Sequence, residues 1–193
     1  MKILVLGEHN ENEIQQATLC VVDAAKKLGG EIDIMLTTNA SDKVVNQAST
    51  IDSVSKVLHF SNERFQNIVG EDVAECALSI SDDYDFFLTS SSTTGKNILP
   101  RIAAKLDIQQ ISEIIEIIDP KTFKKPIYAG SCIATVSTSQ KKNALTIRTT
   151  SFDKAELGSG SAVVETKNCP NFSSRRTDFV KNELTVSDRP ELT

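Results

Sequence analysis

Aromatic residues are scarce in this sequence, which has no tryptophan and only two tyrosines among its 193 residues. Proteins that hold single-stranded nucleic acid stack the bases on aromatic rings, so the scarcity argues against that function. The net charge of −5 argues against binding to duplexes, because phosphate contacts need a clustered basic surface. Basic pairs such as Lys141-Lys142 are scattered and indicate solvated surface. We therefore expect no nucleic-acid partner.

Histidines and paired cysteines are also few. The sequence has no C-x-x-C unit, and His9 and His59 are far apart in it, so no spacing supports a structural zinc site. It therefore predicts no metal site, and it predicts reduced, mostly buried thiols. The four cysteines are Cys20, Cys76, Cys132 and Cys169.

Long apolar runs are missing as well. No run approaches the length that spans a membrane, and Lys2–Gly7 carries no signature of an export signal. We expect a soluble intracellular protein without membrane insertion. The bacterial cytoplasm is the favoured location, with the mitochondrial matrix as the alternative in a eukaryote.

The first half of the chain alternates short apolar runs with amphipathic segments, a pattern typical of βαβ units. Ile3–Leu6 is continuously apolar, as expected of a strand that is covered on both faces. Gly29-Gly30 ends the first amphipathic segment and is typical of a helix terminus. The sequence predicts strands at 3–6, 32–36, 56–60 and 85–89, and helices at 13–28, 42–48, 72–80 and 97–106.

The pattern changes after Leu106, where short β-branched segments follow one another. The connections between them are too short for helical crossovers, which predicts antiparallel or mixed strands added to a parallel core. These segments are 111–118, 123–129, 133–137 and 144–149.

The last part of the chain has weak signals. Beyond Phe152, the segments 158–161 and 165–176 are predicted to be loosely ordered, and 177–184 to form one short amphipathic helix. Pro190 excludes a helix through the final residues, which are typical of an extended connector.

A hydroxyl-rich loop, Ser90–Asn97, lies between a predicted strand and a predicted helix, where backbone N–H groups can hold a phosphate. It departs from the phosphate-binding loop pattern, because Ser90 stands at the first glycine position and Asn97 replaces the hydroxyl that would bind Mg²⁺. Capping of the following helix is the favoured alternative. Pro100, interpreted as an early helical proline, agrees with capping.

Other chemically active residues lack companions in the sequence. Gly7–Asn10 follows the first strand at the edge where α/β sheets bind ligands, but it is no G-x-G-x-x-G fingerprint, and His9 has no evident orienting carboxylate. Glu113 and Glu116 are three residues apart on a predicted strand, which sends them to opposite faces. A dyad of Cys132 with either histidine has no positive support. The sequence therefore assigns no catalytic, cofactor-binding or metal-binding residue.

Several motifs, in one order, resemble the α subunit of electron transfer flavoproteins. The resemblance covers nearly the whole chain and is weakest at 157–181. It rests on Val5–His9, Gly95–Leu106, Ile111–Ile115, Ile127–Gly130, Arg148–Phe152 and Leu184–Thr193.

The resemblance implies a fold, partners and a cofactor. The implied fold is an α/β, Rossmann-like sandwich of three layers, related to the adenine nucleotide alpha hydrolases, with a mostly parallel sheet and added antiparallel strands. Residues 1–184 would form the N-terminal domain, and 185–193 a linker to an FAD-binding domain that this chain does not contain. FAD would belong to that domain and AMP to the β subunit, so no cofactor is expected here.

The implied function is that of a non-catalytic scaffold. It would pair with the β subunit and support the FAD domain, which passes electrons from flavoprotein dehydrogenases such as acyl-CoA dehydrogenases to the respiratory chain. One alternative is a stand-alone adenine-nucleotide-binding domain of the universal-stress-protein type, which needs a phosphate cradle at Ser90–Lys96 and near Gly7. The other is a small hydrolase that uses His9 or Cys132 and needs a pocket joining them.

Overall fold

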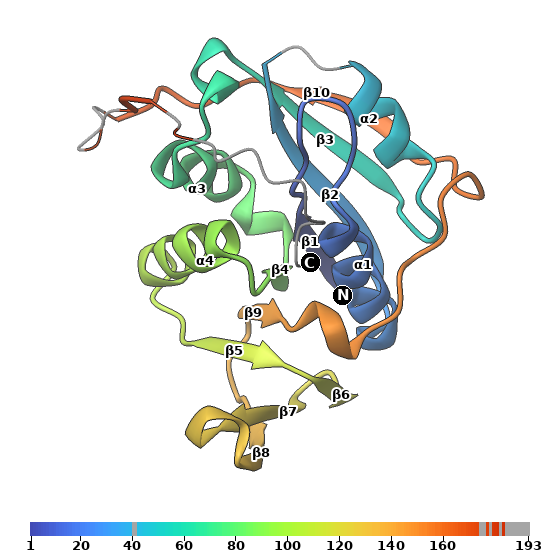
Figure 1. Ribbon diagram of the computed structural model, residues 1–193, viewed down its shortest axis with the longest axis vertical. Helices are drawn as coiled ribbons and strands as arrows, with labels where there is room; N and C mark the ends of the chain where they lie inside the picture. The colour runs from blue at the N-terminus through green and yellow to red at the C-terminus, as the bar shows by residue number, and fades with distance from the viewer. Residues whose placement is uncertain (40–41, 174–176, 178, 182, 184–193) are drawn as a thin grey trace.

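The computed structural model describes residues 1–39, 42–173, 177, 179–181 and 183. Within these residues the centre is a parallel sheet of seven strands in the order β10-β3-β2-β1-β4-β9-β5 (Figure 1). The strands are β1 (Lys2–Leu6), β2 (Glu31–Thr38), β3 (Lys56–Ser61), β4 (Phe86–Ser90), β5 (Gln110–Ile114), β9 (Asn143–Ile147) and β10 (Val163–Lys167).

Helices cover both faces of this sheet, which gives three layers (Figure 1). α1 (Gln16–Leu28) and α2 (Asp42–Ser49) pack on one face, and α3 (Gly70–Ser79) and α4 (Thr93–Lys105) pack on the other. Because both faces are covered, the central strands are apolar throughout, and every residue of Ile3–Leu6 is buried. The predicted Rossmann-like α/β fold is confirmed. Among the described residues, no helix is long and apolar enough to cross a membrane.

A small antiparallel sheet projects beyond β5 and β9 at one end of the molecule (Figure 1), and we call it the extension. Its middle strand carries Phe123, which is fully buried and packs into the main core together with Ile117 and Val136. The three strands are β6 (Glu116–Asp119), β7 (Thr122–Ile127) and β8 (Cys132–Ser137).

The expectation of antiparallel or mixed strands added to a parallel core is met, since the extension is antiparallel and the segments that flank it join the parallel sheet. β5 and β9 lie side by side in the main sheet and run parallel to each other and to β4. The extension itself connects them, so it takes the place of the crossover helix that a parallel pair normally requires.

The prediction of loose order after Phe152 is wrong for β10, which pairs in parallel with β3 along Val163–Lys167. The glycine-rich segment before it is fixed by main-chain hydrogen bonds from Gly158 and Gly160 to the carbonyl oxygen of Thr50. The sequence does not predict β10, because this short strand is held by backbone pairing and shows little apolar periodicity.

Two helices begin three or more residues away from their predicted starts. α1 begins at Gln16 rather than at residue 13, because Ile14 forms an isolated β-bridge with His9. α4 begins at Thr93 rather than at residue 97, because Ser92 caps it. Pro100 therefore lies inside the helix, and its interpretation as an early helical proline is wrong.

The end of the chain is described only in part. In the predicted helix at 177–184, the residues that the structure describes (177, 179–181 and 183) are not helical. The predicted linker at 185–193 lies outside the described residues.

Candidate functional site at the switch point of the sheet

The strand order reverses beside β1, which has β2 on one side and β4 on the other. In open parallel sheets, ligands bind at such a point, in the crevice outside the carboxyl ends of the strands. A cavity of about 280 Å³ lies there. Its walls include Gly7, Glu8 and His9 after β1, Thr89 of β4, and Thr93 and Asn97 of α4.

Gly7 allows the chain to leave β1 in close contact with β2. Its N–H donates to the carbonyl oxygen of Met35 at 2.9 Å. A Cβ atom here would lie 2.7 Å from Cδ2 of Leu36 and 3.0 Å from Cγ2 of Ile34, closer than a Cβ atom normally approaches. The glycine thus holds the following loop close to β2.

The backbone of Glu8 is held by hydrogen bonds with Thr18 of α1 and with Gln15, the residue before this helix. Its N–H donates to Oγ1 of Thr18 at 2.8 Å, and its carbonyl oxygen accepts the Thr18 hydroxyl at 2.9 Å. The N–H of Gln15 donates to the same carbonyl oxygen at 2.9 Å. Because Thr18 is buried, these contacts are shielded from water.

The carboxylate of Glu8 lies at the N-terminus of α4. Ser90 Oγ donates to its Oε1, and Ser92 Oγ lies 2.8 Å from each of its oxygens. Ser92 caps the helix, because its Oγ accepts the N–H of Gly95 at 2.9 Å. The helix dipole and the first-turn N–H groups stabilise negative charge at this point. A side chain of the protein therefore lies where this kind of fold binds an anionic ligand.

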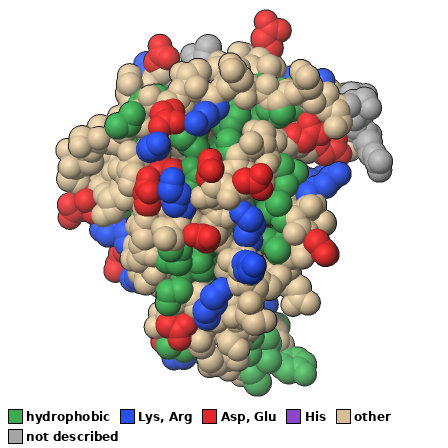
Figure 2. Space-filling view, turned by 180° about the vertical axis from the view of Figure 1, so that it is seen from behind, with side chains coloured by type: hydrophobic (Ala, Val, Ile, Leu, Met, Phe, Trp, Pro, Cys, Tyr) green, Lys and Arg blue, Asp and Glu red, His purple; other side chains and the backbone are tan. Residues whose placement is uncertain are grey.

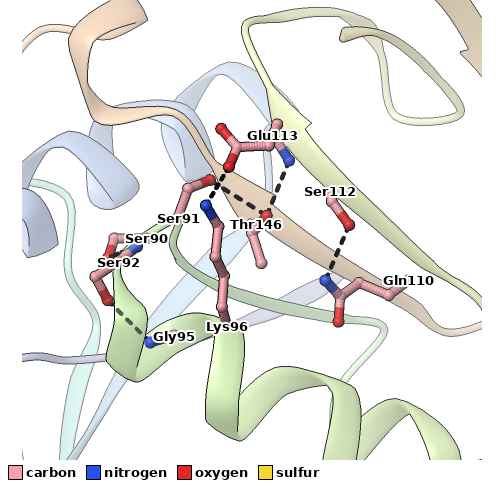
Figure 3. A network of polar contacts seen from close by, with 9 residues as sticks. All are labelled: Ser90, Ser91, Ser92, Gly95, Lys96, Gln110, Ser112, Glu113 and Thr146. Carbon is pink, nitrogen blue, oxygen red and sulfur yellow. Dashed lines mark hydrogen bonds and ion pairs between the residues drawn. The ribbon is translucent and has the colours of Figure 1, made fainter. Parts of the chain in front are cut away.

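Lys96, the basic residue of the hydroxyl-rich loop, turns toward β5 (Figure 3). Its Nζ pairs with the carboxylate of Glu113 at 2.5 Å. The N–H of Glu113 donates to Oγ1 of Thr146 at 2.9 Å, and Ser91 Oγ lies 3.3 Å from the same hydroxyl. The loop thus uses its hydroxyls and its lysine for helix capping and for contacts between strands, which favours the capping interpretation.

The two histidines come to the same edge of the sheet. The ring nitrogens of His9 lie 2.8 Å from the carbonyl oxygen of Asn10 and 2.9 Å from that of Thr37. Nε2 of His59 lies 2.8 Å from the hydroxyl of Thr38. Burial lowers the pKa of His59, and the nearby carboxylate of Asp42 opposes this shift. Within the described part of the chain, no three His, Cys, Asp or Glu side chains are grouped to hold a metal ion.

The cysteines are free thiols in different surroundings. Cys20 and Cys76 are buried, Cys169 is half-buried, and Cys132 is exposed at the start of β8. The prediction of mostly buried thiols is wrong for Cys132, because the extension projects from the core. The extension and β3, which carries His59, lie at opposite ends of the molecule (Figure 1), so the structure does not bring these two residues together.

Glu113 and Glu116 belong to different strands and have different partners. Glu113 lies in β5 at an irregularity in the pairing with β9, where its φ is 59°. Its carboxylate forms an ion pair with Lys96. Glu116 is exposed and pairs with Lys124 at 2.9 Å. The two carboxylates therefore face separate cations rather than a common site.

Exposed apolar side chains gather at the tip of the extension, where Figure 2 shows hydrophobic atoms at the lower end of the molecule. Ile127, Tyr128 and Ile133 are 37%, 79% and 62% exposed. Tyr128 and Ala129 have positive φ values of 48° and 53°, which cost residues other than glycine roughly 1–3 kcal/mol each. We call Ile127, Tyr128 and Ile133 the apolar tip. The sequence predicts short strands at 123–129 and 133–137, but it does not predict that the turn between them is exposed and apolar.

A buried polar pair lies between β2 and the segment before β4. Oδ2 of Asp33 accepts the hydroxyl of Tyr84 at 2.6 Å, and Oδ1 has no partner among the described residues. Asp33 is only 1% exposed, and burial raises its pKa. The carbonyl oxygen of Tyr84 accepts a hydrogen bond from Nζ of Lys142 at 2.7 Å. We interpret this cluster as structural.

Comparison with known proteins gives a consistent picture. The model of the electron transfer flavoprotein domain family matches residues 3–170. The whole chain is 44% identical to the electron transfer flavoprotein subunit alpha of Pseudomonas aeruginosa and covers 62% of that protein. It is 34% identical, over 98% of its length, to a probable mitochondrial subunit alpha of Caenorhabditis elegans, of which it covers 57%. It is also 34% identical, over 98% of its length, to the mitochondrial electron transfer flavoprotein subunit alpha of Dictyostelium discoideum, of which it covers 58%. The chain thus spans about 60% of the length of these relatives.

Proposed function

This chain belongs to the electron transfer flavoprotein family, and from that membership we propose that it is the N-terminal scaffold domain of an α subunit. The domain is non-catalytic by itself, pairs with a β subunit and supports an FAD domain. In the heterodimer, FAD passes electrons from flavoprotein dehydrogenases, such as the acyl-CoA dehydrogenases of fatty acid oxidation, to the respiratory chain, since the redox chemistry belongs to the cofactor. We propose the cytoplasm as its location in a bacterium and the mitochondrial matrix in a eukaryote, since the chain is similar to bacterial and to mitochondrial proteins.

FAD is the cofactor that the family implies, and the switch-point crevice does not fit it. The diphosphate of a dinucleotide needs the hydroxyls and N–H groups at a helix N-terminus, and here the carboxylate of Glu8 engages Ser90 and Ser92. A phosphate at this place would meet a like charge. We therefore place FAD in a domain outside this chain, which residues 185–193 would connect.

The observation that carries the pairing with a β subunit is the apolar tip. Exposed apolar clusters mark interaction sites, and tyrosine is enriched among the residues that dominate binding energy. The turn at the tip is closed by a hydrogen bond from the N–H of Ser131 to the carbonyl oxygen of Tyr128 at 3.1 Å. Phe123 ties the extension to the core. We propose that the β subunit covers this tip.

The universal-stress-protein alternative has one observation in its favour, the cavity at the switch point. It requires a phosphate at the hydroxyl-rich loop, and Glu8 occupies that position. The hydrolase alternative requires a pocket that joins His9 and Cys132, whereas Cys132 is on the extension. The scaffold proposal needs neither site.

The proposal is tested by mixing this chain with the β subunit of the same organism and measuring the mass of the product by size exclusion with light scattering. We expect a one-to-one complex. Tyr128→Ser combined with Ile133→Ser should weaken the affinity about thirtyfold or more, because truncated anchor residues cost about 2 kcal/mol or more.

The matched control for this test is Val163→Ser. Val163 is 61% exposed, like Ile133, and lies on β10, the sheet edge opposite β5. We expect it to bind like the unchanged chain. Loss of binding in the control with normal binding in the tip variant would place the interface elsewhere, and no association of any variant would exclude the pairing itself.

A further inference from the structure

We propose that Glu8 is an internal substitute for a phosphate group and closes the switch-point crevice of this chain to phosphate-bearing ligands. The inference concerns a property of the isolated domain and does not depend on the pairing with a β subunit.

The contacts of the Glu8 carboxylate are those that a bound phosphate makes at a helix N-terminus. Two hydroxyls donate to it, from Ser90 and Ser92, and both belong to the loop that leads into α4. These hydroxyls are also fixed in place, since Ser90 Oγ accepts the N–H of Ser92 at 3.1 Å and Ser92 Oγ accepts that of Gly95 at 2.9 Å. The carboxylate thus uses the donors that an anion would need.

A second observation shows that the crevice has an unused polar group. Thr89 lines the cavity and is 1% exposed, and its Oγ1 has no hydrogen-bond partner among the described residues. A buried hydroxyl without a partner is costly and therefore uncommon. It lies against the first turn of α4, 2.9 Å from the point where a Cβ atom of Gly95 would be. The wall beside the carboxylate thus carries a buried hydroxyl that no described protein atom satisfies.

The backbone of Glu8 is fixed in this position by hydrogen bonds. Hydrogen bonds from Thr18 and Gln15 fix its backbone, so the side chain starts from a rigid base. The basic residue of the loop, Lys96, is directed to Glu113 (Figure 3). Exclusion of phosphate is therefore a fixed property of the site.

The test is titration calorimetry of AMP and of inorganic phosphate into the chain and into Glu8→Ser. We expect no binding of either ligand by the unchanged chain at millimolar concentration. Glu8→Ser removes the carboxylate and leaves the hydroxyls and the helix terminus free, so it should bind both ligands with a Kd about tenfold or more below the highest concentration at which the unchanged chain shows no binding. The matched control is Glu13→Ser, which removes the same charge from the exposed part of the same loop and should gain nothing.

Three results would overturn the proposal. They are AMP binding by the unchanged chain at an affinity like that of Glu8→Ser, an equal gain in Glu13→Ser, and no gain in a Glu8→Ser protein whose circular dichroism shows a folded state. If Glu8→Ser does not fold, Glu8→Gln decides, because it removes the charge and keeps the length of the side chain. A folded Glu8→Gln protein should bind phosphate more tightly than the unchanged chain, and equal affinity would refute the inference.

Discussion

Truncating Phe123 to alanine should destabilise the domain strongly, because this side chain joins the extension to the main core. Phe123 is fully buried, lies opposite Ile117 on one neighbouring strand and Val136 on the other, and packs into the core with both. Replacing a buried phenylalanine by alanine costs about 3–5 kcal/mol, since apolar contacts are lost and a cavity remains.

For a domain of this size, 1 kcal/mol corresponds to a change of about 2–4 °C in Tm. We therefore expect Phe123→Ala to lower Tm by roughly 6–20 °C, measured by circular dichroism and checked by urea unfolding. The matched control is Tyr128→Ala, which truncates a 79% exposed aromatic ring on the same hairpin and should change the stability by about 0.5 kcal/mol or less.

If Phe123→Ala lowers the free energy of unfolding by less than about 1 kcal/mol, this reasoning is refuted, because so small a loss is typical of a side chain that is not packed in the core. It would mean that the extension folds and unfolds separately from the sheet. The apolar tip would then lack the fixed base that the proposed pairing requires.

Two further predictions concern stability. Gly95→Ala should destabilise the domain by roughly 1–3 kcal/mol in urea unfolding, because the added Cβ would lie 2.1 Å from the carbonyl oxygen of Ser90; a stabilised variant would contradict the close packing of α4 on β4. Burial raises the pKa of Asp33 above its unfolded value of 3.8, so on titration the folded state keeps the proton of this carboxyl group to a higher pH than the unfolded state does. The folded state therefore loses stability as the pH rises from about 4 through the folded pKa. Asp33→Asn should remove that loss and be more stable than the unchanged chain at pH 7 but not at pH 3; equal stabilities at pH 7 would contradict it.

The regular part of the fold could be predicted because its signals are local. Buried parallel strands such as Ile3–Leu6 are apolar runs, and the helices between them show one apolar face. β10 could not be predicted, because Val163 and Val164 are its only apolar residues and the strand is held by pairing with β3. The direction of β9 was equally hidden, since it depends on a partner strand far away in the sequence.

The position of the candidate site could be predicted from the sequence, but the contacts between its side chains could not. The position of Gly7–Asn10 after the first strand indicates the ligand edge of the sheet, and Ser90–Asn97 indicates a helix start. The contact between Glu8 and Ser92 joins residues that are 84 positions apart, and no spacing rule reveals it. The apolar tip was missed for a related reason, because exposure of Tyr128 depends on the extension projecting from the core.

Pairing of the apolar tip with a β subunit can be measured by hydrogen–deuterium exchange of this chain with and without that subunit. We expect slower exchange of the amides from Ile127 to Ile133 in the presence of the β subunit, and unchanged exchange in β10. Unchanged exchange at the tip, or protection confined to β10, would contradict this pairing.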